Sequence, residues 1–206
     1  MSDSFNEIAT LRIELQDTDP LIWRKVEVPT SMTLKVVHTV IQATMGWFDS
    51  HLWEFTIGKQ SYGVPMKDDW RPLRTIAADK VRLRDVLKPR KTVIGYVYDF
   101  GDSWEHQLTL TNVRAGEPGA EYPRYIGGER NGPLEDCGGI PGFYELLDAL
   151  ADPRHPNHAD AKQWADDYDP ATFDELPIKY ALSRIARRRN PAKTRLAKSG
   201  GSASAA

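Results

Sequence analysis

Asp99 and His106 stand seven residues apart in a segment, residues 94–110, that reads IGYVYDFGDSWEHQLTL. A carboxylate beside an imidazole can orient the ring as a general base or as a metal ligand. The same two side chains can instead form a structural hydrogen bond, because polar groups on a core-facing surface are costly unless they are paired. The residue types alone leave both alternatives open.

A β-hairpin is the element expected to position this pair. β-Branched and aromatic residues lie on both sides of Gly101-Asp102, which predicts a two-residue turn of type II′ there. Side chains alternate along a strand, so this register places Asp99, Trp104 and His106 on one core-facing surface. We therefore expect the aspartate and the histidine to be partly buried and in contact. A shift of one residue in the register would remove this contact.

Cys137 is the single cysteine, and it lies in a glycine-rich segment, EDCGG, shortly before a predicted helix. Backbone N–H groups at a helix start lower the pKa of a thiol and would make it a nucleophile, whereas the two adjacent acids oppose ionisation. The alternative is a small buried side chain in a tight turn. If this loop folds over the hairpin, the thiol would meet the aspartate and the histidine. The candidate catalytic residues are therefore Asp99, His106 and Cys137.

Further residues are candidates for binding. His51 precedes a predicted strand and completes the set of candidate metal ligands, His51, Asp99 and His106. We nevertheless expect neither a resident metal nor a cofactor. A single cysteine excludes cysteine-cluster zinc sites, and no glycine-rich phosphate loop, HExxH or G-x-S-x-G motif is present. The candidate binding residues are Asp102, Trp104, Trp53, Tyr62 and Arg24.

Hydrophobic periodicity predicts the elements that carry these residues. Strands are expected at residues 8–16, 21–28 and 52–57 and in the hairpin, with one helix at residues 33–45 and three more after residue 140. Residues 65–80 and 115–133 are expected to be loops. The prediction is a single α+β domain with a mostly antiparallel sheet of about five strands, an N-terminal crossover helix and three C-terminal helices.

The charge distribution sets the expected domain boundaries and partners. The chain has 206 residues and a net charge of −2, yet seven basic residues and no acid follow Ser183. We expect residues 1–6 to be disordered, residues 7–189 to form the domain, and residues 190–206 to be a basic, then Gly/Ser/Ala-rich, disordered tail. A weak nucleic-acid contact is one interpretation of these basic residues, and a solvated surface is the other. They are Arg184, Arg187, Arg188, Arg189, Lys193, Arg195 and Lys198. Without a secretion signal or a long apolar run, we expect a cytoplasmic protein that contacts no membrane.

Several motifs resemble, in the same order, those of the plasmid pRiA4b open-reading-frame-three-like family. The motifs are LIWRKVEVP at residues 21–29, SHLWEF at 50–55, YVYDFGDSWEH at 96–106 and EDCGGIPGFYELL at 135–147, and the resemblance spans about residues 8–188. Members are often labelled insertion-sequence passenger proteins with a resolvase-type (TnpR) name. The resemblance implies a compact α+β domain and supplies no catalytic residues.

Two functions remain open from the sequence. The first is an accessory or binding domain associated with plasmids or mobile elements, without an assigned biochemical activity. The alternative is a small metal-assisted or thiol hydrolase that uses the Asp/His/Cys cluster described above. Serine recombination is disfavoured, because Ser103 lies beside Asp102 and Glu105, whose charges would repel a phosphodiester.

Overall fold

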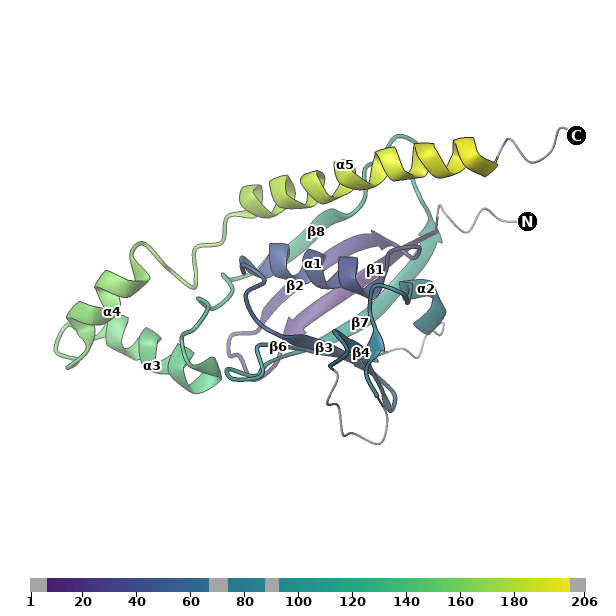
Figure 1. Cartoon of the computed structure of the whole chain (residues 1–206). Coiled ribbons are helices and arrows are strands. Elements are labelled where there is room, and N and C mark those ends of the chain that lie inside the picture. The colour runs from purple at the N-terminus through teal and green to yellow at the C-terminus, as the bar shows by residue number, and fades with distance from the viewer. Residues whose placement is uncertain (1–6, 67–73, 88–92, 201–206) are drawn as a thin grey trace, which may run out of the picture.

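A sheet of eight strands organises the part of the chain that the structure, a computed structural model, describes: residues 7–66, 74–87 and 93–200 (Figure 1). The strands are β1 (Glu7–Leu15), β2 (Ile22–Pro29), β3 (Trp53–Ile57), β4 (Gln60–Gly63), β5 (Ile76–Ala77), β6 (Val93–Tyr98), β7 (Trp104–Ala115) and β8 (Arg124–Glu129). Their order across the sheet is β5-β4-β3-β6-β7-β1-β2-β8. The pairing of β4 with β5 is parallel and the others are antiparallel, so the sheet is mixed.

The predicted α+β class is correct, but the predicted sheet of about five mostly antiparallel strands is wrong. The additional strands β4, β5 and β8 lie in segments that the sequence predicts as turns or loops. β5 has two residues and β8 reads RYIGGE, so neither shows the alternation of apolar and polar residues on which strand prediction depends. They form because a neighbouring strand supplies hydrogen-bond partners, β2 for β8 and β4 for β5.

Helices cover one face of the sheet and extend beyond one end of it. The described residues contain α1 (Leu34–Met45), α2 (Leu83–Val86), α3 (Gly139–Ala151), α4 (His158–Ala165) and α5 (Glu175–Gly200). α1 links β2 to β3, as the predicted crossover helix would, and it contacts α5 (Figure 1). α3 and α4 pack against each other beyond the end of the sheet, around a small apolar cluster of their own (Figure 1).

α1 forms where the sequence predicts it. The Thr33 side chain accepts a hydrogen bond from the Val36 N–H at 3.4 Å, which caps the first turn. Gly46 follows the last turn with φ 84°, a left-handed conformation that glycine adopts without steric cost. The residues of the predicted apolar stripe, Leu34, Val37, Ile41 and Met45, are all buried.

The C-terminal boundary differs from the prediction. α5 continues to Gly200, so residues 190–200, which the sequence places in a disordered tail, are helical. Residues 1–6 and 201–206, also predicted to be disordered, lie outside the described residues. In the described part of the chain, no helix is both long enough and apolar enough to span a membrane.

The β6–β7 hairpin has a different register from the predicted one. Tyr98 pairs with Trp104 and Tyr96 with His106, whereas the predicted register pairs Asp99 with Trp104. The turn therefore contains residues 99–103, and Asp99 and Ser103 adopt positive φ angles of 56° and 55°. This one-residue shift moves the two tyrosine rings into the core beside Trp104 and His106, and it takes Asp99 out of the strand.

Candidate metal centre

Three loops meet at one end of the sheet and bring a histidine and two aspartates together. His51 lies between α1 and β3, Asp99 follows β6, and Asp136 lies between β8 and α3. His51 Nε2 is 3.0 Å from Asp136 Oδ1 and 3.7 Å from Asp99 Oδ2. One potential ligand atom from each residue lies within 4.8 Å of the others. This group, called the metal centre below, has the donor types and the spacing of a cation site.

The loop that carries His51 is held by residues of the core. Asp49 accepts a hydrogen bond at 2.7 Å from His38, whose buried ring stacks on Trp53 with ring centroids 3.9 Å apart. The Ser50 N–H donates to the Tyr98 hydroxyl at 3.0 Å. The backbone on the N-terminal side of His51 is therefore fixed to α1 and β6, and the histidine position does not depend on the His51 side chain.

The hairpin turn leaves one oxygen of Asp99 available. Asp99 donates its N–H to the Leu52 carbonyl at 2.9 Å, and its Oδ1 accepts from the Gly101 N–H at 2.9 Å. The second oxygen, Oδ2, faces His51, and the Asp99 side chain is 13% exposed. A non-glycine residue with φ of 56° is strained by about 1 kcal/mol or more, and Asp tolerates this region better than most residues. The turn thus holds one carboxylate oxygen toward the histidine.

Two other acids attach the β8–α3 loop to the hairpin. Glu135 accepts hydrogen bonds from the Tyr98 hydroxyl and from the Phe48 N–H. Asp102 Oδ2 accepts from the Gly138 N–H at 3.1 Å. A Cβ at Gly139 would lie 2.4 Å from the Asp102 carbonyl oxygen, so this close approach requires glycine. These contacts present the neighbouring Asp136, which is 71% exposed, to His51.

The metal centre sets one imidazole nitrogen against two carboxylates. His51 Nε2 is shielded from solvent and, in the described part of the chain, forms no hydrogen bond, although two carboxylate oxygens lie close to it. A neutral nitrogen lone pair facing two carboxylates is repelled by both. A proton on His51 or a metal ion between the three groups removes this repulsion. One imidazole and two carboxylates suit Zn²⁺, Mn²⁺ or Fe²⁺, and three protein ligands leave positions open for solvent or another ligand.

The predicted contact between Asp99 and His106 is wrong. His106 is fully enclosed: its Nδ1 is hydrogen-bonded to the Trp104 carbonyl at 2.9 Å, and its ring packs edge-on against Trp47. Burial lowers the pKa of His106 to about 4, so the ring is neutral near pH 7. Of the three candidate metal ligands, the structure brings together His51 and Asp99, with Asp136 in place of His106.

Cys137 is poorly suited to nucleophilic catalysis. Burial, followed by the nearby Asp102 carboxylate, raises the pKa of the Cys137 thiol to about 12. At neutral pH this thiol is therefore protonated and unreactive. The EDCGG segment does fold onto the hairpin, as the sequence analysis considered, but Asp136 rather than Cys137 faces the Asp99 carboxylate.

The candidate binding residues have different surroundings. Trp53 and Trp104 belong to the buried core, and Tyr62 is half-buried against its edge. Asp102 anchors Gly138, while Arg24 is buried in a separate cavity described below. From the sequence, Glu135 and Asp136 were interpreted only as acids that oppose ionisation of Cys137, and neither was a candidate ligand. The sequence signal that could have indicated this site is the pair of acids, Glu135 and Asp136, close to the paired glycines Gly138 and Gly139.

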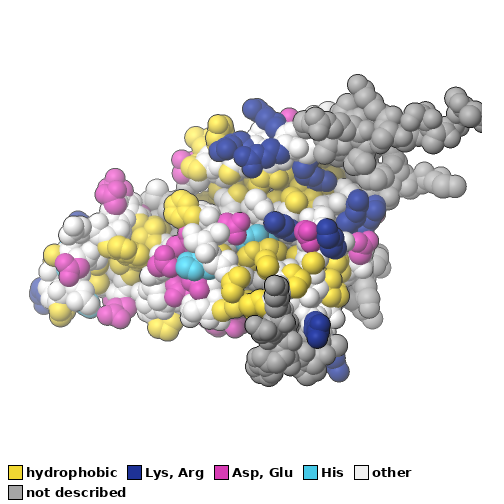
Figure 2. All heavy atoms as spheres, in the orientation of Figure 1, with side chains coloured by type: hydrophobic (Ala, Val, Ile, Leu, Met, Phe, Trp, Pro, Cys, Tyr) yellow, Lys and Arg dark blue, Asp and Glu magenta, His cyan; other side chains and the backbone are white. Residues whose placement is uncertain are grey.

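The basic residues of α5 are partly described. Arg184, Arg187 and Arg188 are exposed, whereas Arg189 is half-buried and donates to the Ser31 hydroxyl at 3.2 Å. Figure 2 shows basic side chains gathered over α5 and acidic side chains nearer the α3–α4 end. The side chains of the remaining basic residues, Lys193, Arg195 and Lys198, lie outside the part of the chain that the structure describes. Nucleic-acid contact through this segment stays a prediction.

Comparison with known proteins shows which family the chain belongs to. The family model described as "Plasmid pRiA4b ORF-3-like protein" matches residues 7–176. The chain belongs to this family. It is 34% identical over 182 residues to the uncharacterized protein y4hQ of Sinorhizobium fredii (strain NBRC 101917 / NGR234), covering 87% of this chain and 92% of that protein. A crystal structure of MM3350, a protein of unknown function from Methanosarcina mazei Go1, superposes with a TM-score of 0.77 at 32% identity, covering 86% of this chain and 98% of the other.

Proposed function

We propose that this protein is a metal-dependent binding domain whose metal centre, His51, Asp99 and Asp136, holds one divalent ion. The observation that carries the proposal is the His51 Nε2 atom, which is shielded from solvent and faces two carboxylates without a hydrogen bond among the described residues. Two carboxylates that face one imidazole repel each other, a cation between them relieves this repulsion, and the donor set matches that of first-row metals. An accessory role associated with plasmids or mobile elements is the wider context that we propose, and the family name, which refers to a plasmid, supports its first part.

The surroundings of the metal centre favour the binding of a further molecule. Three large apolar side chains in the loops of His51 and Asp99 are exposed: Phe48 is 83% exposed, Phe100 50% and Leu52 47%. Exposed aromatic rings around a partly coordinated ion suit a ligand that has one coordinating group and an apolar body. Binding of such a ligand would complete the coordination that three protein residues leave open.

A metal-assisted hydrolase is the second candidate. Its support is the same open coordination, since a bound ion with a free position lowers the pKa of a coordinated water and generates a nucleophile. The thiol form of this hypothesis is disfavoured by the raised pKa of Cys137. Measuring metal binding and ester or phosphoester hydrolysis on the same preparation separates the two: binding without turnover supports the binding domain.

Calorimetric titration of the chelator-treated full chain with Mn²⁺ or Zn²⁺ tests the metal centre. We expect the wild type to bind one ion per chain. His51→Gln, Asp99→Asn and Asp136→Asn should each bind the ion at least roughly tenfold more weakly than the wild type. Asp167→Asn is the matched control, because Asp167 is an exposed aspartate in the turn after α4 and lies outside the cluster. Equal affinity in all four variants, or no binding by the wild type, would contradict the proposal.

A further inference from the structure

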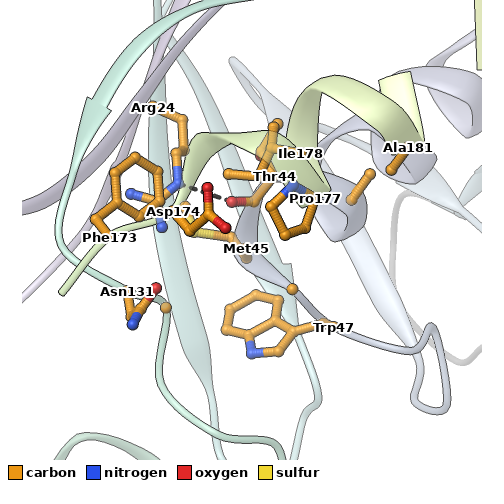
Figure 3. Close-up of a pocket in the computed structure, with 13 residues that line it drawn as sticks. Arg24, Thr44, Met45, Trp47, Asn131, Phe173, Asp174, Pro177, Ile178 and Ala181 are labelled. Carbon is orange, nitrogen blue, oxygen red and sulfur yellow. Dashed lines mark hydrogen bonds between the residues drawn. The ribbon is translucent and has the colours of Figure 1, made fainter. Parts of the chain in front are cut away.

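A second cavity lies away from the metal centre, between the end of α1, the start of α5 and the loop after β8 (Figure 3). Its volume is about 370 Å³, which suits a small organic molecule. Apolar side chains form most of its wall, among them Met45, Trp47, Phe173 and Ile178. Figure 3 shows Arg24 extending into this space from the sheet and Trp47 facing it from the opposite side.

Arg24 is a buried charge without a carboxylate partner. Its side chain is almost fully enclosed, with 1% of the residue exposed. Nε donates to the Thr44 carbonyl at 2.7 Å, and Nη1 donates to the carbonyls of Trp23 and Glu129 at 2.8 Å each. The Phe173 ring covers the guanidinium at 4.2 Å. Among the described residues, no hydrogen bond reaches Nη2 and no acid forms an ion pair with Arg24.

Two tyrosine hydroxyls near Arg24 also lack partners. Tyr125 Oη and Tyr168 Oη are shielded from solvent, and neither has a hydrogen-bond partner within the described ranges. Gly128 brings the first of them close, because a Cβ at this glycine would lie 2.6 Å from Tyr125 Oη and 2.9 Å from Arg24 Cδ. Buried hydroxyls and guanidinium N–H groups are rarely left unpaired. Neither tyrosine lines the cavity, so the Arg24 guanidinium is the group that can offer a ligand there both a hydrogen-bond donor and a positive charge.

We propose that this cavity binds a small monocarboxylate with an apolar body. The carboxylate accepts from Arg24 Nη2, while the body packs on Trp47 and Ile178. Arginine suits a carboxylate because its N–H groups match the spacing of the two oxygens. Asp174 also lines the cavity, and its negative charge penalises dianions such as phosphate more than singly charged carboxylates.

The burial of Arg24 gives the ligand an energetic role. Burial lowers the pKa of the guanidinium to about 10 from the usual 12.5, because its charge is removed from water without an anion beside it. The three backbone carbonyls stabilise the charge only through dipoles. A bound carboxylate supplies the missing negative charge and raises that pKa again, so the binding site is preorganised for it.

Three probes test the charge requirement by calorimetry on the full chain: 3-phenylpropionate, its neutral amide 3-phenylpropanamide, and inorganic phosphate. We expect saturable binding of 3-phenylpropionate, at least roughly tenfold weaker binding of the amide, and no heat from phosphate. Equal binding of the acid and the amide would show that Arg24 makes no contribution. Preferred binding of phosphate, or no binding of 3-phenylpropionate, would overturn the proposed ligand class.

Two variants separate binding from folding. Ala181→Leu places a larger side chain on the α5 wall of the cavity and leaves Arg24 unchanged, so it should abolish 3-phenylpropionate binding while the protein remains folded. Asp167→Asn is the matched control, because this exposed aspartate lies outside the cavity and outside the metal centre, and it should leave this binding intact. Unchanged affinity in Ala181→Leu would place the ligand elsewhere and contradict the proposal. A loss in both variants would contradict it too, since the loss would then not depend on the cavity.

Discussion

The metal centre and the Arg24 cavity are built in opposite ways. The metal centre takes one residue from each of three loops, and two of its residues, Asp99 and Asp136, have left-handed backbones with φ of 56° and 60°. The Arg24 cavity is walled mainly by regular elements, and its charged side chain joins β2 to α1 and β8. Side chains of the first site can therefore change at little cost to folding, whereas Arg24 is both a structural brace and a binding group.

Acid should produce the largest loss, because two buried histidines support both regions. His38 anchors the loop of His51, and His106 packs on Trp47, which lines the cavity. Burial lowers the pKa of each to about 4 in the folded chain, against 6.5 when unfolded. The unfolded chain binds protons first, so this stability is complete above pH 6.5 and is lost as the pH falls toward 4.

Urea denaturation at pH 7.0 and pH 4.5 measures this effect. We expect roughly 2–3 kcal/mol less stability per histidine at the lower pH. His106→Gln should have a smaller difference between the two pH values than the wild type, since one of the two protonation events is removed. A wild-type stability that is equal at both pH values would show that these rings are not buried as described.

Replacing Arg24 should give the second largest effect. Arg24→Met keeps the apolar stem but leaves three backbone carbonyls, of Trp23, Thr44 and Glu129, without their donor. We expect a loss of about 2–4 kcal/mol in the free energy of unfolding at pH 7, measured by urea denaturation. Arg24→Lys should lose less, because an ammonium group can still donate to some of these carbonyls. A loss of less than about 0.5 kcal/mol in the free energy of unfolding would show that Arg24 is not a structural brace, and the Arg24 cavity would then not differ from the metal centre in this respect.

The metal-centre acids should give the smallest effect on the metal-free protein. Asp99→Asn and Asp136→Asn remove a negative charge, and Asn tolerates positive φ as well as Asp does. Thermal denaturation of each metal-free variant should therefore give a free energy of unfolding within about 0.5 kcal/mol of the wild-type value. The stabilisation that Mn²⁺ gives the wild type should be absent in both. A large loss without metal would instead identify a structural ion pair with His51.

Local signals account for the parts of the fold that the sequence predicts correctly. Thr33 and Gly46 bound α1, and the apolar stripe between them fixes which side is buried. β8 has no such local signal, because it contains two glycines, of which Gly128 is required by the close approach of Tyr125 and Trp23. Strands of this kind are specified by the partner strand, which the local sequence does not contain.

The hairpin explains why the site was predicted only in part. Gly101 appeared to be the residue with positive φ, but Asp99 and Ser103 adopt it, and burial of the Tyr96 and Tyr98 rings decides the register. His51 and Asp99 could be selected by residue type. Their meeting with Asp136 depends on three loops that are distant in the chain, and one sequence carries no information on that distance.

The position of β1 has a consequence for folding during synthesis. Of the described strands β1 is made first, yet it lies between β2 and β7, with Leu15 opposite His106. The β1–β2 hairpin can form early, but the other edge of β1, with Leu11 and Ile13, has no partner until residues 104–115 have been made. Pairings of such long sequence separation are slow, and an open apolar edge is prone to aggregation. The nascent chain is therefore most prone to aggregation in the interval between the synthesis of β1 and the synthesis of β7.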